Sequence, residues 1–211
     1  MTKALIFDLD NCLAAASEVG EALFEPTFEA IRQANRGTVS EEVLRRALAD
    51  AWRYPLDWVA VQYGFSEAML AAGKQSFATV EVREPMVGYG DLATLAELPV
   101  ARFLVTSGFR RLQESKIKAL NAEGLFTAIF IDALDEPGRL GKHGLFQKIL
   151  ADYALAPDEV LVVGDSAESE IAAGNRLGIA TVQTLRPGVP HAANATFHIH
   201  SLTELKPLLK R

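Results

Sequence analysis

The chain has 211 residues, of which 49% are hydrophobic and 23% are charged, and this is enough for one substantial core with a small accessory domain. Its 27 acidic and 21 basic residues give a formal net charge of −6, which argues against a broad nucleic-acid-binding surface. No apolar run approaches the roughly 18 residues that a membrane-spanning helix needs. We therefore expect a globular protein that binds neither nucleic acid nor a membrane.

The start of the chain and its cysteine content bear on location. A strand pattern begins within three residues of Met1, without the basic segment, apolar stretch and cleavage site of a secretory signal. The single cysteine, Cys12, leaves no pair for an internal disulfide and suits a reducing compartment. We expect a cytoplasmic protein that is a monomer or a homodimer.

The first predicted strand ends in two carboxylates. Apolar residues 4–7 predict a buried strand, and Asp8 and Asp10 follow it directly. In a parallel sheet, ligands gather beyond the carboxyl ends of such strands. Two carboxylates this close resist ionising together unless they share a cation or divide into nucleophile and acid. Alone, the pattern is also typical of a simple turn, because Asp readily bonds its own backbone there.

Residues 18–82 carry helical signals and almost no strand pattern. Ser40 and Ser66, each followed by glutamate, predict the starts of two helices. The sequence therefore predicts a helical cap domain over residues 18–82, inserted into a core domain formed by residues 1–17 and 83–211.

The remaining residues alternate between strand and helix patterns. Further buried strands are predicted at residues 101–105, 128–131, 160–163 and 179–182, with a weaker one at 196–199. Helical spacing of apolar residues falls at 92–98, 112–125, 145–153 and 171–177, and Ser201 with Glu204 forms a capping box before a last helix. This alternation predicts an α/β fold with a Rossmann-like, doubly wound parallel sheet.

Two segments of the core domain offer groups that bind phosphate. Thr106 and Ser107 follow the second core strand, where a hydroxyl and backbone amides can hold phosphate oxygens, although an ordinary helix cap has the same pattern. Lys142 lies in the glycine-rich loop 138–144, just ahead of a helix, and can neutralise charge on a phosphoryl group.

A third segment adds further carboxylates. Asp165 directly follows the buried strand 160–163, and Glu168 and Glu170 come soon after it. Because the carboxyl ends of parallel strands meet at one edge of a sheet, we expect these groups to lie near Asp8 and Asp10.

Taken together, these segments resemble the four motifs of the haloacid dehalogenase (HAD) superfamily, in order and over the whole core. Asp8 to Asp10 resembles the first motif, Thr106 the second, Lys142 the third, and Asp165 with Glu170 the fourth. The resemblance implies a hydrolase with a helical cap, and specifically a Mg²⁺-dependent phosphatase that acts on a small phosphorylated substrate.

Carried over to this chain, the resemblance implies that Asp8 is the nucleophile and forms an aspartyl-phosphate. Asp10 would act as general acid and base. Mg²⁺ would be bound by the Asp8 carboxylate, the Asp10 backbone carbonyl, Asp165 and Glu170.

The phosphoryl oxygens would then be held by Thr106, Ser107 and Lys142, with help from the backbone amide of Asn11. Two positions depart from the family pattern. Cys12 stands where the family usually has Thr, and Glu170 replaces a second Asp, which leaves Glu168 as a possible substitute metal ligand.

Several chemistries of the superfamily remain open to this sequence. Dehalogenases of this superfamily lack a carboxylate at the position that Asp10 matches, since a displaced halide needs no proton, so the resemblance favours a phosphate ester over a halide as substrate. A phosphomutase and a non-catalytic binding module with the same fold remain alternatives. A nucleoside monophosphate or a sugar phosphate would suit the active site.

The residues that would select the substrate lie in two further groups. Arg110 and Arg111 are expected near the site. The aromatic residues of the cap would either stack on substrate or pack within the cap: Trp52, Tyr54, Trp58, Tyr63 and Phe65.

Overall fold

The computed structural model describes residues 1–209, and over these residues the fold is built on a six-stranded parallel sheet. The strand order is β3-β2-β1-β4-β5-β6, so the order reverses between β1 and β4, as in a doubly wound sheet. This confirms the α/β fold expected from the sequence. The strands are β1 Ala4–Phe7, β2 Ala101–Gly108, β3 Ala128–Ala133, β4 Val160–Gly164, β5 Ala180–Thr184 and β6 Phe197–Ile199.

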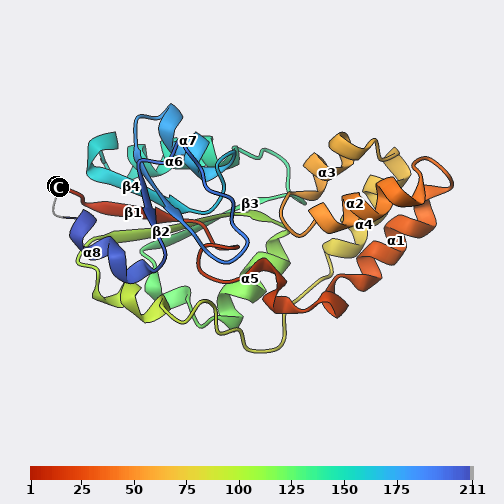
Figure 1. The fold of residues 1–211 in the computed structure, drawn as a ribbon, viewed down its shortest axis with the longest axis horizontal. Coiled ribbons are helices and arrows are strands. Elements are labelled where there is room, and N and C mark those ends of the chain that lie inside the picture. Colours follow the sequence, from red (N-terminus) through yellow and green to blue (C-terminus); the bar gives the residue numbers. More distant parts are fainter. Residues whose placement is uncertain (210–211) are drawn as a thin grey trace.

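Both faces of the sheet are buried, which explains why its central strands are apolar throughout. Ala4 and Ile6 of β1 point into a cluster with helices α6 (Gly141–Asp152) and α7 (Glu170–Arg176). Leu5 and Phe7 point to the opposite face, where α5 (Arg110–Ala119) and α8 (Leu205–Leu208) supply the packing. Figure 1 shows α6 and α7 above the sheet and α5 below it.

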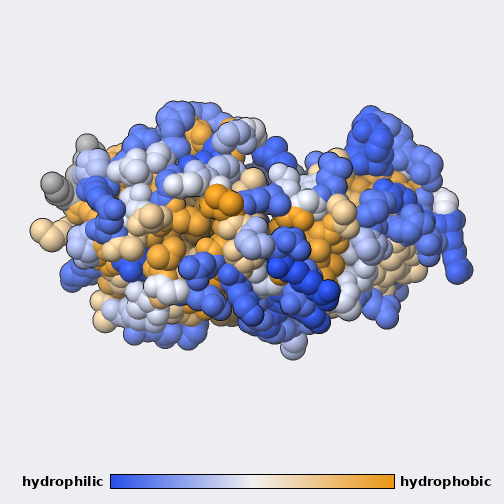
Figure 2. Space-filling view, turned by 90° about the horizontal axis from the view of Figure 1, so that it is seen from below, coloured by the Kyte–Doolittle hydropathy of each residue, from blue (hydrophilic) through white to orange (hydrophobic). Residues whose placement is uncertain are grey.

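Four helices occupy the long connection between β1 and β2: α1 Glu25–Asn35, α2 Glu41–Asp50, α3 Leu56–Tyr63 and α4 Glu67–Phe77. They lie beyond the carboxyl ends of the strands (Figure 1), and the space-filling view shows them as a lobe set apart by a notch (Figure 2). The predicted helix starts are confirmed, because Ser40 and Ser66 each cap a helix with a side-chain oxygen. The domain boundaries at residues 18 and 82 remain a prediction.

The helices of the insert pack against one another, and one glycine sets how closely they approach. A Cβ added at Gly73 of α4 would lie 3.0 Å from Leu56 and 3.1 Å from Ile31. Side chains on α1 and α3 therefore occupy the space that a side chain at position 73 would need. The four helices thus pack closely on one another, and their buried apolar residues are continuous with the core on one face of the sheet.

Several element bounds differ from the sequence prediction for local reasons. The helix predicted over 92–98 is a 3-10 helix, Leu92–Glu97, and it ends before Leu98 because Pro99 disfavours helical backbone in the residue before it. The helix predicted over 112–125 ends at Ala119, and Asn121 then adopts a φ of 52°. The capping box of Ser201 and Glu204 is confirmed and begins the short 3-10 turn before α8. Within residues 1–209, no helix combines the length and apolar character needed to cross a membrane.

Candidate active site

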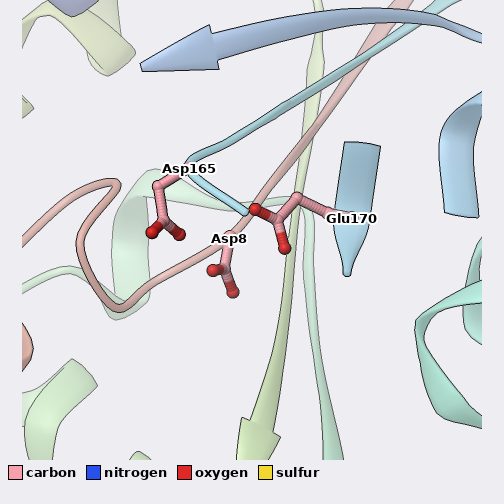
Figure 3. A group of neighbouring side chains, drawn as sticks. All are labelled: Asp8, Asp165 and Glu170. Carbon is pink, nitrogen blue, oxygen red and sulfur yellow. The ribbon is translucent and has the colours of Figure 1, made fainter. Parts of the chain in front are cut away.

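Three carboxylates converge at the point where the strand order reverses. Asp8 leaves β1, and its backbone N–H donates to Val163 O of β4 at 2.9 Å, which holds it at the seam between the two strands. Asp165 follows β4, and Glu170 is the first residue of α7. Their carboxylate oxygens lie within 4.8 Å of one another, around a common space (Figure 3). The sequence predicted this convergence from strand ends alone.

Gly164 makes room for Glu170, the residue that departs from the family pattern. A Cβ added at Gly164 would lie 2.2 Å from Glu170 Cγ, so the longer side chain fits only because position 164 is a glycine. Glu170 Oε1 accepts the N–H of Ser166, and Oε2 accepts from Lys142. Glu170 therefore joins Asp8 and Asp165, whereas Glu168 lines the cleft outside this group.

Lys142 neutralises part of this charge. Its Nζ lies 2.8 Å from Asp8 Oδ1 and 2.7 Å from Glu170 Oε2, and the side chain is only 9% exposed. Burial on its own would lower the pKa of Lys142, but the charges of Asp8 and Glu170 outweigh it and raise that pKa above its usual value. The lysine is therefore a fixed positive charge beside the predicted nucleophile.

Lys142 lies in the first turn of α6 and not in a loop ahead of it, as the sequence had predicted. The cause is Asp132, the buried fifth residue of β3, whose Oδ1 accepts the N–H of Gly141 at 3.0 Å and starts the helix there. The other oxygen of Asp132 pairs with Arg139 at 2.6 Å, and Arg139 also reaches Asp57 of α3. This chain of contacts links the insert to the segment that carries Lys142.

The acidic group carries more negative charge than Lys142 balances. Burial, together with neighbouring carboxylates, raises the pKa of Asp8 to about 7 and that of Asp165 to about 8. Carboxylate oxygens gathered in this way are the donors that a hard divalent cation such as Mg²⁺ prefers. The residues present therefore fit the predicted magnesium ion.

Asp10 faces the same cleft but has separate partners. Its Oδ1 accepts from Lys116 Nζ at 2.8 Å, and its Oδ2 accepts from Gln113 Nε2 at 3.1 Å. Thr106, which is 1% exposed, and Ser107 lie in β2 and line the cleft beside it. The strand thus runs two residues beyond Thr106, further than the sequence indicated.

The turn after β1 alters two of the predicted roles. The backbone N–H of Asn11, which was expected to bind phosphate, already donates to Ala14 O at 2.6 Å, so that role would require this bond to break. Cys12 is buried with its Sγ 3.7 Å from Val163 O. Burial raises the pKa of the Cys12 thiol well above its ordinary value, which leaves it a protonated packing residue.

The carboxylates open into a cleft of about 550 Å³ with an aromatic wall on the insert side. Phe77 of α4 stacks on Phe109, which follows β2, with ring centroids 5.1 Å apart. Trp52 packs on Phe24 at 4.5 Å. These rings cover the junction between the insert and the sheet.

The predicted aromatic cluster is therefore divided between packing and the cleft. Tyr54 and Trp58 line the cleft and stack on each other at 4.1 Å between centroids, with Trp58 39% exposed. Tyr63 instead donates its hydroxyl to Asp50 at 2.5 Å. The side chain of Phe65 packs with the apolar interior.

Arg110 and Arg111 were expected near the site, and this prediction is wrong. Arg110 pairs with Glu136, and Arg111 pairs with Glu81. Both arginines line a separate surface depression and not the cleft.

Sequence reasoning missed four residues that organise the site: Gln113, Lys116, Asp132 and Arg139. Asp132 carried a usable signal, because it follows the apolar run 128–131 just as Asp8 and Asp165 follow theirs. Gln113 and Lys116 lie between Leu112 and Ile117 on the buried face of α5, where polar residues are unusual. Arg139 lies in a loop and carried no such signal.

The comparisons with known proteins agree with this geometry. Residues 2–178 match the family model of haloacid dehalogenase-like hydrolases. The chain is 30% identical over 140 residues to pyrimidine 5'-nucleotidase YjjG of Escherichia coli, covering 63% of this chain and 60% of the nucleotidase, which is less than two thirds of its length. It is 25% identical over 204 residues to glyceraldehyde 3-phosphate phosphatase of Methanopyrus kandleri, covering 88% and 85% of the two chains.

A solved structure shows the same fold. The HAD-hydrolase YfnB from Bacillus subtilis, determined with magnesium bound, superposes with a TM-score of 0.62 at 15% identity and covers 100% of this chain and 99% of its own. The motif residues meet at one sheet edge, and the family model spans most of the chain. The chain therefore belongs to the haloacid dehalogenase-like hydrolases.

Proposed function

We propose that this hydrolase is a Mg²⁺-dependent phosphatase that acts on a small phosphorylated metabolite through an aspartyl-phosphate on Asp8. The observation that supports this most directly is the pairing of Asp8 with Lys142 at 2.8 Å within a group that includes Asp165 and Glu170. A carboxylate nucleophile beside a buried cation suits attack on an anionic phosphoryl group.

In the first step, an Asp8 oxygen attacks phosphorus and forms a new P–O bond. The bond from phosphorus to the ester oxygen breaks, and its electron pair stays on that oxygen. Asp10 supplies the proton that this oxygen takes up, so the product leaves as a neutral alcohol. Asp10 is suited to this role because its side chain lies outside the Asp8 group and is 24% exposed.

In the second step, Asp10 accepts a proton from water as the water oxygen attacks the same phosphorus. The bond from phosphorus to Asp8 breaks, which frees inorganic phosphate, restores the Asp8 carboxylate and leaves Asp10 protonated for the next turnover. One residue thus serves as acid and then as base.

Charge in both steps is balanced by groups at the carboxyl ends of the strands. Lys142, Thr106 and Ser107 would hold the phosphoryl oxygens, because phosphoryl transfer depends chiefly on positioning and charge stabilisation. Mg²⁺, held by Asp8, Asp165 and Glu170 and with the Asp10 carbonyl proposed as a further ligand, would neutralise charge on the transferred group.

For the rest of the substrate we propose a nucleoside monophosphate. Tyr54 and Trp58 form a stacked pair on the insert side of the cleft, and flat aromatic surfaces of this kind bind nucleobases by stacking. The similarity to a pyrimidine 5'-nucleotidase supports the same class. A sugar phosphate is the competing substrate class in the test.

The test measures phosphate release from nucleoside monophosphates and sugar phosphates, with Mg²⁺ and then with a chelator. Three proteins are compared: wild type, Asp8→Asn, and Asp158→Asn, which changes an exposed aspartate just before β4, at the opposite end of that strand from Asp165. We expect release to depend on Mg²⁺, to fall more than about 10³-fold in Asp8→Asn, and to persist in Asp158→Asn.

Three results would contradict parts of this proposal. Undiminished release by Asp8→Asn would exclude Asp8 as nucleophile. Faster release from sugar phosphates would overturn the assignment of substrate. Isomerisation of a sugar phosphate without release would replace the phosphatase with a phosphomutase.

A further inference from the structure

We infer that Lys116 and Gln113 of α5 are positioning residues that hold the Asp10 carboxylate for proton transfer. The inference rests on the proposed function, because it concerns the acid and base of that reaction. Lys116 Nζ lies 2.8 Å from Asp10 Oδ1, and Gln113 Nε2 lies 3.1 Å from Asp10 Oδ2. Each carboxylate oxygen is therefore held by one donor of its own.

Both donors are buried, which distinguishes this contact from a surface ion pair. The Lys116 side chain is 5% exposed, and Gln113 is 3% exposed. A buried ammonium is costly unless it is paired, and Asp10 supplies that pairing. The long lysine side chain thus reaches from α5 to Asp10 at the cleft, where Lys116 and Gln113 both form part of the wall.

The backbone around Gln113 leaves space for this arrangement. A Cβ added at Gly108, the last residue of β2, would lie 2.4 Å from Gln113 Nε2. The same nitrogen also donates to Ser107 O at 3.0 Å. Because both of its neighbours are acceptors, the amide must present nitrogen to them.

This orientation leaves the other amide atom unsatisfied. Within the described residues, Gln113 Oε1 is buried without a hydrogen-bond partner. An unsatisfied buried acceptor destabilises the fold, but the opposite amide orientation would lose both hydrogen bonds of the nitrogen, to Asp10 and to Ser107. The orientation of the Gln113 amide is therefore the one that donates a hydrogen bond to Asp10, although it leaves Oε1 without a partner.

The two lysines keep two neighbouring carboxylates apart. Lys142 holds Asp8, whereas Lys116 holds Asp10, two residues away. The Asp10 side chain consequently stays out of the group formed by Asp8, Asp165 and Glu170. Each carboxylate oxygen can accept at more than one position, so a single donor on each leaves room for the proton exchanged with substrate.

The test compares alkyl and aryl phosphate monoesters, because an alkoxide needs a proton on leaving and p-nitrophenolate does not. The quantity measured is kcat/KM, which reports the steps up to formation of the phosphoenzyme. The variants are Lys116→Met, Gln113→Leu and the conservative Lys116→Arg. Lys118→Met is the control, since it changes an exposed lysine on the same helix. Asp10→Asn is the reference variant, because it removes the proton donor and so gives the difference in kcat/KM between alkyl and aryl esters that is expected when proton transfer is lost.

We expect Lys116→Met to lower kcat/KM for an alkyl ester by about 10- to 100-fold and for p-nitrophenyl phosphate by less than about 3-fold. Lys116→Arg should recover much of the alkyl activity, and Gln113→Leu should show the same selectivity in weaker form. Gln113→Leu removes no charge, so it carries the test if Lys116→Met fails to fold.

Equal losses for alkyl and aryl esters in both folded variants would overturn the inference, because they would indicate a structural role alone. A wild-type enzyme that hydrolyses neither kind of ester would instead overturn the proposed function and this inference with it. The two failures are therefore distinguishable.

Discussion

Replacing Gly164 by alanine should displace Glu170 and weaken both the fold and the metal site. The new Cβ would lie 2.2 Å from Glu170 Cγ and 2.5 Å from its Oε1, far inside normal contact distance. Glu170 is 1% exposed and has little free space into which it can move. The substitution therefore tests directly how this glutamate is accommodated.

The expected magnitude follows from two contributions. Overpacking of a buried position costs about 1–3 kcal/mol. Displacing Glu170 also weakens its hydrogen bond from the Ser166 N–H, and bonds to charged groups contribute about 1.5–3 kcal/mol. Because relaxation at one contact relieves the other, we expect a total loss of about 2–4 kcal/mol. For a chain of this size that corresponds to a fall in Tm of about 4–16 °C.

The assay is thermal unfolding followed by circular dichroism, combined with calorimetric titration of Mg²⁺. Gly124→Ala is the matched control, because a Cβ at Gly124 meets no atom within 4 Å and its φ is not positive. The control should remain within about 1 kcal/mol of wild type. Gly164→Ala should bind Mg²⁺ about 10- to 100-fold more weakly, as when groups supporting a metal site are moved.

A Gly164→Ala protein with the Tm and Mg²⁺ affinity of wild type would refute this reasoning. It would show that Glu170 does not lie over position 164 when the protein is in solution. A loss of Tm without a loss of Mg²⁺ affinity would confirm the steric contact but remove Glu170 from the metal ligands.

Three further predictions concern charge and substrate binding. Lys142→Met should destabilise the metal-free protein by about 3–5 kcal/mol, because it leaves buried carboxylates unpaired. Added Mg²⁺ should then raise the Tm of this variant more than that of wild type. Equal rises in Tm for the two proteins, measured by thermal unfolding, would argue against competition between the lysine and the metal for the carboxylates. The folded-state pKa values of Asp8 and Asp165 are raised to about 7 and 8, so the folded protein binds protons more tightly than the unfolded chain. The contribution of these two groups to the free energy of unfolding is therefore fully present below about pH 4 and is lost as the pH rises through 7 to 8. Mg²⁺ binding should therefore release protons at pH 6–7, and calorimetry in buffers of different ionisation enthalpy that detects no release would contradict the shifts. Trp58→Ala should raise KM for a nucleoside monophosphate about 5- to 150-fold, because stacking on the indole ring is lost. Val61→Ala, at an 86% exposed position of the same helix, is the control and should leave KM unchanged. Equal KM values for the two variants in steady-state assays would exclude stacking of the substrate on Trp58.

The parts of the site that the sequence predicted were those fixed by local pattern. Asp8 and Asp165 each follow a buried strand, and parallel strands bring their carboxyl ends to one edge. Their convergence needed no knowledge of distant contacts. The same reasoning placed Thr106 at the cleft, although the strand continues past it.

The sequence predictions failed where the position of a side chain depends on a hydrogen-bond or ion-pair partner far along the chain. Arg110 pairs with Glu136 across 26 residues, which turns it away from the predicted site. Lys142 lies in a helix because the carboxylate of Asp132 begins that helix one residue earlier. Lys116 reaches Asp10 across 106 residues, and nothing in the local spacing of either residue indicates the other.

The most direct test of the mechanism is to look for the phosphoryl group on Asp8 during turnover. The enzyme is mixed with substrate and Mg²⁺, quenched in acid, digested, and the peptides are examined by mass spectrometry with and without hydroxylamine, which cleaves acyl phosphates. We predict a hydroxylamine-sensitive phosphoryl adduct on Asp8 that is absent without Mg²⁺ and absent in Asp8→Asn. Phosphate release that continues in Asp8→Asn, or an adduct on a different residue, would contradict the central role of Asp8.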